Sequence, residues 1–407
     1  MFGPAGSVSP PDIGFIVFSD DWGEHPSSSQ HLFRHIVERH PVLWVNTIGM
    51  RNPTLSLADL RKVWRKASRM LGAGRAPAAT PEKHAPLPAL LRVCQPFMLP
   101  FSSSGFVRRF NRRSVLRAVS DAANEFMPAR CVVVSTVPNA CDYVDAFKAE
   151  RVVYYCVDDF SQWPGLEHDL VRNMERQLID KSDVLVATSR NLQSKLAGYG
   201  LPLHLLNHGV DLDLFSVEPD HVHPSLAVIP APRAGYFGLI DERSDQRLLS
   251  QLADRMPDVS FVFTGPVATS VDELARKPNV HFTGAVPYAQ LPSIVKGLSV
   301  LMLPYVVNDF TASISPLKLK EYLATGRPVI CTPMAEALHQ QPYVTIADGV
   351  EAWVAAVRAG LSADIDQRRQ QAKQLLAGES WREKAATFAA LCAGAAGVAS
   401  AQGAVAE

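Results

Sequence analysis

The sequence lacks the cysteine pattern of a metal-binding or disulfide-rich protein. None of its six cysteines form a CxxC pair, and each lies in an apolar or mixed stretch. This distribution argues against a zinc site and a disulfide scaffold, and it indicates a reducing compartment. No apolar run reaches the ~18 residues of a membrane-spanning helix. No cation precedes Arg34, so a secretion signal is not expected. These absences predict a cytoplasmic protein that is not integral to a membrane.

Two nucleotide-binding fingerprints are also missing. The first strand is followed by Ser19–Glu24 (SDDWGE), which is not a GxGxxG turn, and two carboxylates would repel a pyrophosphate. The chain contains no Walker A loop either. A nicotinamide-dependent dehydrogenase is therefore disfavoured, although a strand and helix pattern by itself does not decide between functions.

The chain has no net charge, but its charged residues are unevenly distributed. The chain has 40 Lys and Arg against 40 Asp and Glu, which makes a globally basic nucleic-acid binder unlikely. The window 51–117 nevertheless contains 14 Lys and Arg and only two acids, Asp59 and Glu82. Large apolar residues such as Phe106 and Phe110 are interleaved with these cations. The pattern predicts a peripheral surface for an anionic membrane. The alternative is a solvated helical face that acidic neighbours balance.

Short apolar runs alternate with helical-period segments along the whole chain, which is typical of parallel sheets covered by helices. The expected strands are Ile13–Phe18, Val42–Asn46, Leu91–Cys94, Cys131–Ser135, Val152–Cys156, Val184–Thr188, Leu203–Leu206, Ala234–Gly238, Ser260–Thr264, Val280–Thr283, Val300–Pro304, Pro328–Cys331 and Tyr343–Ile346. The expected helices are Ser28–Arg39, Leu57–Leu71, Gly105–Phe126, Leu166–Lys181, Arg190–Tyr199, Asp245–Met256, Tyr288–Lys296, Leu317–Ala324 and Val350–Leu361.

A proline-rich polar stretch divides this α/β pattern into two halves. We predict an N-terminal domain over 1–214, a linker over 215–233 and a C-terminal domain over 234–379. A last helix over 380–392, with Ser380 as its N-cap and Glu383 at the capping-box position, is expected to return to the first domain. The tail 393–407 is expected to be disordered.

Three segments of the second half carry the most specific chemistry: Gly235–Arg243 (GYFGLIDER), Asn279–Gly284 (NVHFTG) and Ser315–Val329 (SPLKLKEYLATGRPV). A glycine at the end of a strand lets the backbone approach a ligand. Ser315-Pro316 opens a helix with proline at its first position, and the start of a helix favours an anion. Lys318 adds a charge in the first turn, and Glu321 can reach a neutral polyol such as a ribose. The pattern predicts a site for a diphosphate joined to a ribose.

These segments resemble those of GT-B glycosyltransferases of family 4, in the branch that writes its donor motif as SPLK..EYLA.G.PV. The first half adds Phe18–Pro26 (FSDDWGEHP), Tyr154–Phe160 (YYCVDDF) and Asn207–Phe215 (NHGVDLDLF). The resemblance covers roughly 13–391. It implies two doubly wound, Rossmann-like domains facing across a cleft, with the acceptor on the first domain and the nucleotide sugar on the second.

The implied reaction is a retaining, metal-independent hexosyl transfer without a cofactor, from a UDP- or GDP-linked sugar to a lipid-linked or surface-polysaccharide acceptor. The implied donor-binding residues are Gly238, Glu242, Arg243, Gly265, Val286, Ser315, Pro316, Leu317, Lys318 and Glu321. By position, Glu321 resembles the second glutamate of the family's E-x7-E motif, whereas Ser313 stands in place of the first. Leu239 stands where the family has arginine, so Arg243 and Lys318 are the expected catalytic cations.

The acceptor side is expected on the first domain. Asp158 and Asp159 follow a strand and are candidates to accept a proton from the acceptor hydroxyl or to bind its hydroxyls; the alternative is a turn cap. Other candidate substrate-binding residues are Asp20, Asp21, Trp22, His208 and Ser313. Asp211-Leu212-Asp213 spells a DxD metal motif, for which we expect a structural role instead.

Two other functions compete with the sugar transferase. One is a nucleotide-sugar epimerase of the same fold, which would turn over without an acceptor. The other is a catalytically degenerate scaffold or sugar-nucleotide-binding protein, which the departures at Ser313 and Leu239 favour.

Overall fold

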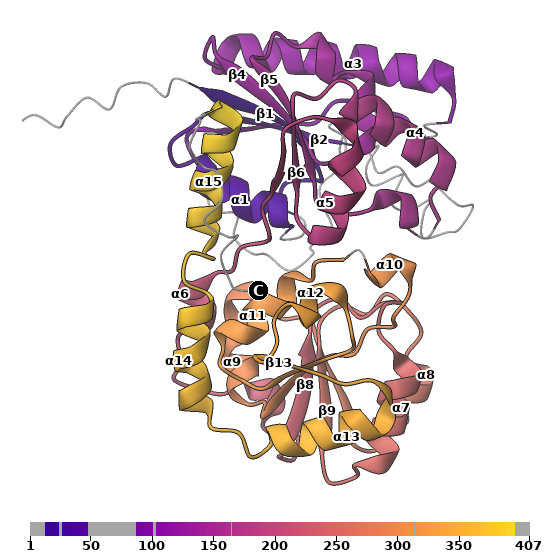
Figure 1. Cartoon of the computed structure of the whole chain (residues 1–407), viewed down its shortest axis with the longest axis vertical. Coiled ribbons are helices and arrows are strands. Elements are labelled where there is room, and N and C mark those ends of the chain that lie inside the picture. The colour runs from indigo at the N-terminus through magenta and orange to yellow at the C-terminus, as the bar shows by residue number, and fades with distance from the viewer. Residues whose placement is uncertain are drawn as a thin grey trace, which may run out of the picture. The chain divides into compact units, whose positions relative to one another are not determined.

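The computed structural model describes residues 13–23, 27–47, 87–100, 103–163, 165–312 and 314–394. The chain divides into two compact units: Met1–Asn207 together with Lys384–Glu407, and His208–Glu383 (Figure 1). Each unit is a parallel sheet flanked by helices, so the predicted fold class is confirmed. The predicted helix 57–71 and residues 395–407 of the predicted tail lie outside the described residues.

The first unit contains a seven-stranded sheet in the order β3-β2-β1-β4-β5-β6-β7. Its strands are β1 (Gly14–Ser19), β2 (Val42–Asn46), β3 (Leu91–Cys94), β4 (Cys131–Ser135), β5 (Arg151–Cys156), β6 (Val184–Ala187) and β7 (Leu203–Leu205). Its helices are α1 (Ser28–Ile36), α3 (Gly105–Phe126), α4 (His168–Ile179) and α5 (Arg190–Leu196). All residues of β1, β2 and β4 are buried, because helices cover both faces of a parallel sheet.

The helix α15 (Trp381–Ala393) belongs to the first unit from Lys384 onward. Its Phe388 ring packs against Phe33 of α1 and Tyr155 of β5, with ring centres 5.9 and 5.1 Å apart. The predicted capping box forms: the Glu383 amide donates to Ser380 Oγ, and the Ser380 amide donates to the Glu383 carboxylate. The helix therefore starts where its capping residues predict.

The second unit contains a six-stranded sheet in the order β10-β9-β8-β11-β12-β13. Its strands are β8 (Arg233–Phe237), β9 (Ser260–Thr264), β10 (Val280–Gly284), β11 (Val300–Leu303), β12 (Val329–Cys331) and β13 (Val344–Ile346). Its helices are α6 (Leu212–Phe215), α7 (Gln246–Arg255), α8 (Asp272–Ala275), α9 (Leu291–Lys296), α10 (Asp309–Ala312), α11 (Leu317–Ala324), α12 (Ala335–Leu338), α13 (Gly349–Gly360) and α14 (Ile365–Leu375).

The stretch predicted as a linker, 215–233, lies within the second unit. Phe215, Leu226 and Ile229 are buried in the core of this unit. The Arg233 guanidinium donates hydrogen bonds to the carbonyls of Leu226, Ile229 and Gly297. Proline ends regular structure in this stretch, but the apolar side chains between the prolines still anchor it to the core.

Burial of His31 on α1 predicts a loss of stability in mild acid. Burial, followed by the charges of Arg34 and His35, lowers the pKa of His31 from 6.5 to about 4. Between these values the unfolded chain binds a proton that the folded chain does not, so the free energy of unfolding falls as the pH falls. We expect wild type to lose about 2 kcal/mol between pH 7 and pH 5 through this group, by the conversion of about 1.4 kcal/mol per pKa unit.

Urea unfolding at both pH values measures this effect. His31→Gln should remove the loss, and His339→Gln, at an exposed position, should retain it. Equal pH dependence in wild type and His31→Gln would contradict the assignment.

Candidate active site

The strand order of the second unit reverses between β8 and β11, which are neighbours in its sheet. In doubly wound sheets, ligands bind beyond the carboxyl ends of the strands at such a switch point. Gly238 directly follows β8, and Pro304-Tyr305 follows β11. The strand order alone therefore predicts a ligand-binding site at Gly238 and Pro304-Tyr305.

Three glycines with positive φ form this edge of the sheet. Gly238 and Gly265 follow β8 and β9 at φ values of 130° and 149°, and Gly284 ends β10 at 76°. A Cβ on Gly238 would overlap Cε of Lys318, and a Cβ on Gly265 would overlap the carbonyl oxygen of Gly238. Only glycine fits at Gly238 and Gly265, because the missing side chains let Lys318 and the Gly238 carbonyl pack directly against these turns.

Two cations meet at Tyr305. Nζ of Lys318 lies 3.4 Å from the Tyr305 hydroxyl oxygen, and 5.5 Å from the centre of the Tyr236 ring. The Arg243 guanidinium carbon lies 5.6 Å from the centre of the Tyr305 ring. The structure thus brings the predicted Lys318 and Arg243 together at Tyr305. Tyr305 was not identified as a site residue from the sequence.

The electrostatic effect of these cations is visible in Tyr305 itself. Burial opposes ionisation of its hydroxyl, but the charges of Lys318 and Arg243 lower the pKa of Tyr305 below its ordinary value. Within the described residues, no carboxylate lies within ion-pair distance of Lys318. The switch point is therefore a region of positive potential.

Arg243 differs from Lys318 because it is already paired. Its Nη2 lies 2.6 Å from Oδ2 of Asp241, and its Nε donates to Oδ1 at 2.9 Å. Burial opposes the charged form, but the hydrogen bonds to Asp241 raise the pKa of Arg243 above its ordinary value. Asp241 fixes the guanidinium and offsets its charge, so Lys318 is the stronger source of positive potential.

Glu321 lies on α11, one turn after Lys318, and is buried. The Tyr288 hydroxyl donates a 2.7 Å hydrogen bond to Oε1 of Glu321. Burial raises the pKa of Glu321, and the Tyr288 hydrogen bond and the Lys318 charge partly oppose the increase. The carboxylate is thus an oriented acceptor of hydroxyl hydrogen bonds, as a contact to a ribose requires.

The other predicted donor residues are placed unequally around this site. The helix α11 begins at Leu317, so the buried Pro316 is its N-cap rather than its first residue, and Ser315 precedes it half-buried. Val286 packs against the core of the unit. Glu242 is exposed, and Ser313 lies outside the described residues.

In the first unit, the aspartates after β1 have different surroundings. Asp20 accepts hydrogen bonds from Ser19, Ser27 and Gln30, and so ties the end of β1 to the start of α1. Asp21 is half-buried beside it. The Trp22 ring packs edge-on against Trp44, with ring centres 4.8 Å apart. These contacts fix the positions of Asp20 and Trp22 in this loop.

The two aspartates after β5 also have different surroundings. Oδ1 of Asp159 caps the turn at Ser161 and lies 2.9 Å from Nζ of Lys195. Burial opposes ionisation, but these hydrogen bonds lower the pKa of Asp159 below its ordinary value. Lys195 in turn pairs with the buried Glu175, at 2.6 Å. Asp159 makes the turn cap that the sequence left as an alternative, whereas Asp158 is half-buried at the same strand end.

His208 and the DxD sequence lie at the start of the second unit. His208 is buried near Trp381, and its carbonyl oxygen accepts a hydrogen bond from Lys320. Oδ1 of Asp211 accepts from the Leu214 amide and caps α6. The sequence Asp211-Leu212-Asp213 thus supplies a helix cap, in line with its expected structural role.

This pair of doubly wound sheets, with a cationic switch point in the second, has the GT-B architecture. HepE from Anabaena, in complex with UDP and glucose, superposes with a TM-score of 0.60 at 12% identity over 93% of this chain and 99% of HepE. Sucrose-phosphate synthase from Thermosynechococcus elongatus gives a TM-score of 0.65 at 12% identity over 93% of this chain and 98% of the synthase. Likeness at this identity establishes the fold alone.

The sequence comparisons carry the assignment further. Residues 234–363 match the family described as Glycosyl transferases group 1. TuaH of Bacillus subtilis, named for glycosyltransferase activity in teichuronic acid biosynthesis, is 26% identical over 251 residues. That match covers 56% of this chain and 63% of TuaH, so less than two thirds of the relative is spanned. The chain thus has the GT-B fold, and residues 234–363 of its second unit resemble the Glycosyl transferases group 1 family.

Proposed function

We propose that the protein is a retaining, metal-independent glycosyltransferase that moves a hexosyl group from a nucleoside-diphosphate sugar to a lipid-linked or surface-polysaccharide acceptor. The observation that carries the proposal is the convergence of Lys318 and Arg243 on Tyr305, beside the glycine turn at Gly238 and the start of α11. In this proposal the donor diphosphate lies against these groups.

The chemistry of the leaving group explains why cations are needed here. The nucleoside diphosphate gains negative charge as its bond to the sugar breaks. Oriented positive groups that meet this charge stabilise the transition state more than the ground state. Lys318, the guanidinium that Asp241 orients and the first amides of α11 are the groups that this unit offers.

The remaining donor contacts follow from position. Glu321 accepts hydrogen bonds from the ribose hydroxyls, with Tyr288 moving aside or joining the contact. The base lies beside Gly284 and Val286, at the end of β10. HepE and an E. coli trehalose-6-phosphate enzyme are described in complex with UDP and UDP-2-fluoro glucose, respectively, which favours a UDP-linked donor here.

On the acceptor side, the proposal rests on the first unit. Asp158 and Asp159 at the end of β5 are the proposed contacts to an acceptor hydroxyl, with Asp159 held in place by its ion pair with Lys195. The name of TuaH refers to teichuronic acid biosynthesis and favours a polysaccharide-type acceptor.

A thermal-shift screen of UDP, GDP, ADP and TDP, with and without EDTA, tests the donor site. A ligand that binds the folded state raises the free energy of unfolding by mass action, by about 2.7 kcal/mol at 100-fold excess over Kd, and so raises the melting midpoint. We expect one nucleotide to raise the melting midpoint by the same amount with and without EDTA. We expect the protein to transfer or hydrolyse the sugar of the corresponding nucleotide-sugar donor. Binding without turnover would favour the sugar-nucleotide-binding alternative, and no shift with any nucleotide would contradict the proposal.

A lipid-linked acceptor lies at a membrane surface, so the protein needs a surface that binds the membrane. The exposed face of α3 has the side chains for such a surface. The side chains of Phe106, Phe110 and Phe97 are 78, 37 and 42% exposed. Arg109 and Arg113 are exposed at helical spacing with them. Residues 51–86 and 101–102 of the basic window lie outside the described residues. Among the described helices, none has both the length and the hydrophobicity needed to cross a bilayer.

We therefore propose that α3 attaches the protein to an anionic cytoplasmic membrane face. Cations attract anionic lipid by about 1 kcal/mol each near the surface, and aromatic side chains enter the headgroup region. Phe106→Ser with Phe110→Ser should lower co-sedimentation with phosphatidylglycerol vesicles at least about tenfold. Val228→Ser, which removes a 90% exposed apolar residue of the second unit, should leave it unchanged. Equal binding to neutral and anionic vesicles would refute this attachment.

A further inference from the structure

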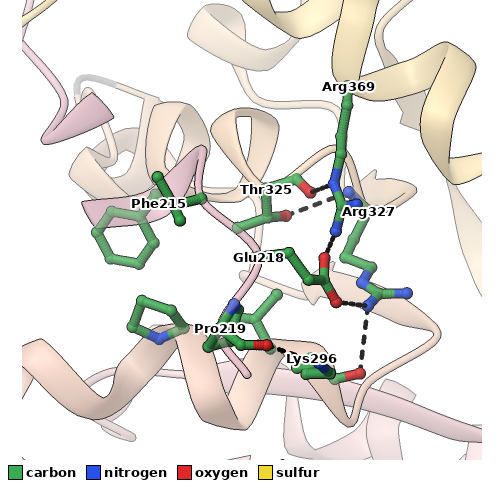
Figure 2. Close-up of a pocket in the computed structure, with 10 residues that line it drawn as sticks. Phe215, Glu218, Pro219, Lys296, Thr325, Arg327 and Arg369 are labelled. Carbon is green, nitrogen blue, oxygen red and sulfur yellow. Dashed lines mark hydrogen bonds and ion pairs between the residues drawn. The ribbon is translucent and has the colours of Figure 1, made fainter. Parts of the chain in front are cut away.

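A small pocket lies in the second unit, at the amino-terminal edge of its sheet (Figure 2). With Glu218 in place its cavity volume is about 10 Å³, which is room for about one water molecule. It is formed by the chain that follows α6, by α9, by the end of α11 and the start of β12, and by α14. This edge is opposite to Gly238, because α11 runs antiparallel to the strands and its eight residues span about 12 Å. The charged residues of the pocket therefore lie apart from Lys318 and Arg243, although its Phe215 packs against Tyr288.

Two arginines flank one carboxylate in this pocket, and a lysine holds the backbone that follows it. Glu218 lies between two arginines: its Oε1 is 3.5 Å from Nη2 of Arg327, and its Oε2 forms an ion pair with Arg369 (Figure 2). Lys296 donates to the carbonyls of Pro219 and Asp220 at 2.6 and 3.1 Å. Nε of Arg369 also donates to the Thr325 carbonyl at 3.4 Å. The second carboxylate near Arg369 is Asp366, at 3.7 Å, whose side chain is 91% exposed and hence well screened.

Arg327 is incompletely satisfied. Its Nη2 also donates to the Lys296 carbonyl, but its buried Nε has no hydrogen-bond partner within the part of the chain that the structure describes. Burial lowers the pKa of Arg327. A buried guanidinium with a donor to spare stabilises an additional anion.

We propose that this pocket binds a phosphoryl group, and that Glu218 occupies its place when no ligand is bound. A carboxylate that bridges two guanidiniums has the arrangement in which arginines hold phosphate. The Glu218 side chain is 35% exposed and stands on an irregular segment, so an incoming anion can displace it. Phe215, Val217 and Pro292 add an apolar wall, which suits a small organic group on the phosphate. In this proposal a phosphate, or a small phosphate monoester, takes up the space that the Glu218 carboxylate leaves when it is displaced.

The test measures binding of inorganic phosphate and of a hexose 6-phosphate to the full chain by calorimetry, at constant ionic strength. Glu218→Gln keeps the size of the side chain and removes its charge, so we expect it to tighten phosphate binding at least fivefold. Arg369→Gln should abolish the response in the Glu218→Gln background. The matched control is Glu351→Gln, which removes a carboxylate from the exposed Arg255–Glu351 pair and should change nothing.

Two further arms identify the source of the phosphoryl group and separate this site from the donor site. Tighter binding of the hexose phosphate than of inorganic phosphate would identify an esterified ligand, and equal binding would identify free phosphate. Lys318→Ala should retain the phosphate response, and Glu218→Gln should retain nucleotide affinity. If Glu218→Gln gains no phosphate affinity, or if Arg369→Gln leaves it intact, Glu218 is only a structural clasp and the proposal is wrong.

Discussion

Lys318→Ala is expected to lower kcat about 10²- to 10³-fold, the usual loss when one donor to a developing negative charge is removed. Among the residues that the structure describes, Nζ of Lys318 meets only hydroxyl and ring partners, at Tyr305 and Tyr236. Its charge is therefore available to the leaving diphosphate, whereas the charge of Arg243 is offset by Asp241. Because the interaction strengthens as the bond breaks, kcat should fall more than donor affinity.

Initial rates at saturating donor, with the nucleotide sugar found by the screen, measure this effect. Lys373→Ala is the matched control, since Lys373 is an exposed lysine on α14. It should retain full activity. A Lys318→Ala enzyme within threefold of wild type would mean that Lys318 does not act on the leaving group.

Gly265→Ala should cost about 3–4 kcal/mol of stability and abolish donor binding. A Cβ at this position would overlap the carbonyl oxygen of Gly238, which is backbone and has no rotamer by which to move. The φ value of 149° adds strain for any other residue. The turn after β8 would have to shift, and that turn borders the diphosphate site.

Gly284→Ala separates the effect of backbone strain from the effect of a steric overlap with the new Cβ. Gly284 also has a positive φ, 76°, but a Cβ there would meet no atom within 4 Å. We expect a cost of about 1 kcal/mol and retained nucleotide affinity. Thermal unfolding and nucleotide titration of both variants give the comparison. Equal effects of the two substitutions would contradict the close packing of Gly265 on Gly238.

The strands could be predicted from the sequence because parallel strands buried on both faces are continuous apolar runs. The runs at 42–46, 91–94, 131–135 and 260–264 match β2, β3, β4 and β9 residue for residue. The helix α14 was missed because its sequence, IDQRRQQAKQL, buries only Ala372 and so has no apolar stripe to detect. Helix ends were less certain, and α1 stops at Ile36 instead of Arg39.

The residues of the candidate site that belong to sequence motifs were predicted, but the residues that contact them were not. Lys318, Glu321 and Gly238 belong to local motifs, so their types and spacing were informative. Tyr305, Tyr288 and Asp241 act through contacts that spacing does not encode. Tyr305 could have been found, because it follows a predicted strand that a doubly wound order places next to β8. The pairing of Asp159 with Lys195 joins residues 36 positions apart and left no local trace.

The most direct test of the account is a titration of the nucleoside diphosphate against its monophosphate in EDTA. If protein charge alone holds the second phosphate, wild type should bind the diphosphate at least about tenfold tighter, equal to about 1.4 kcal/mol. In the Arg243→Ala, Lys318→Ala double variant the two nucleotides should bind about equally. A wild type that does not distinguish them, or a double variant that keeps the preference, would contradict the proposed diphosphate site.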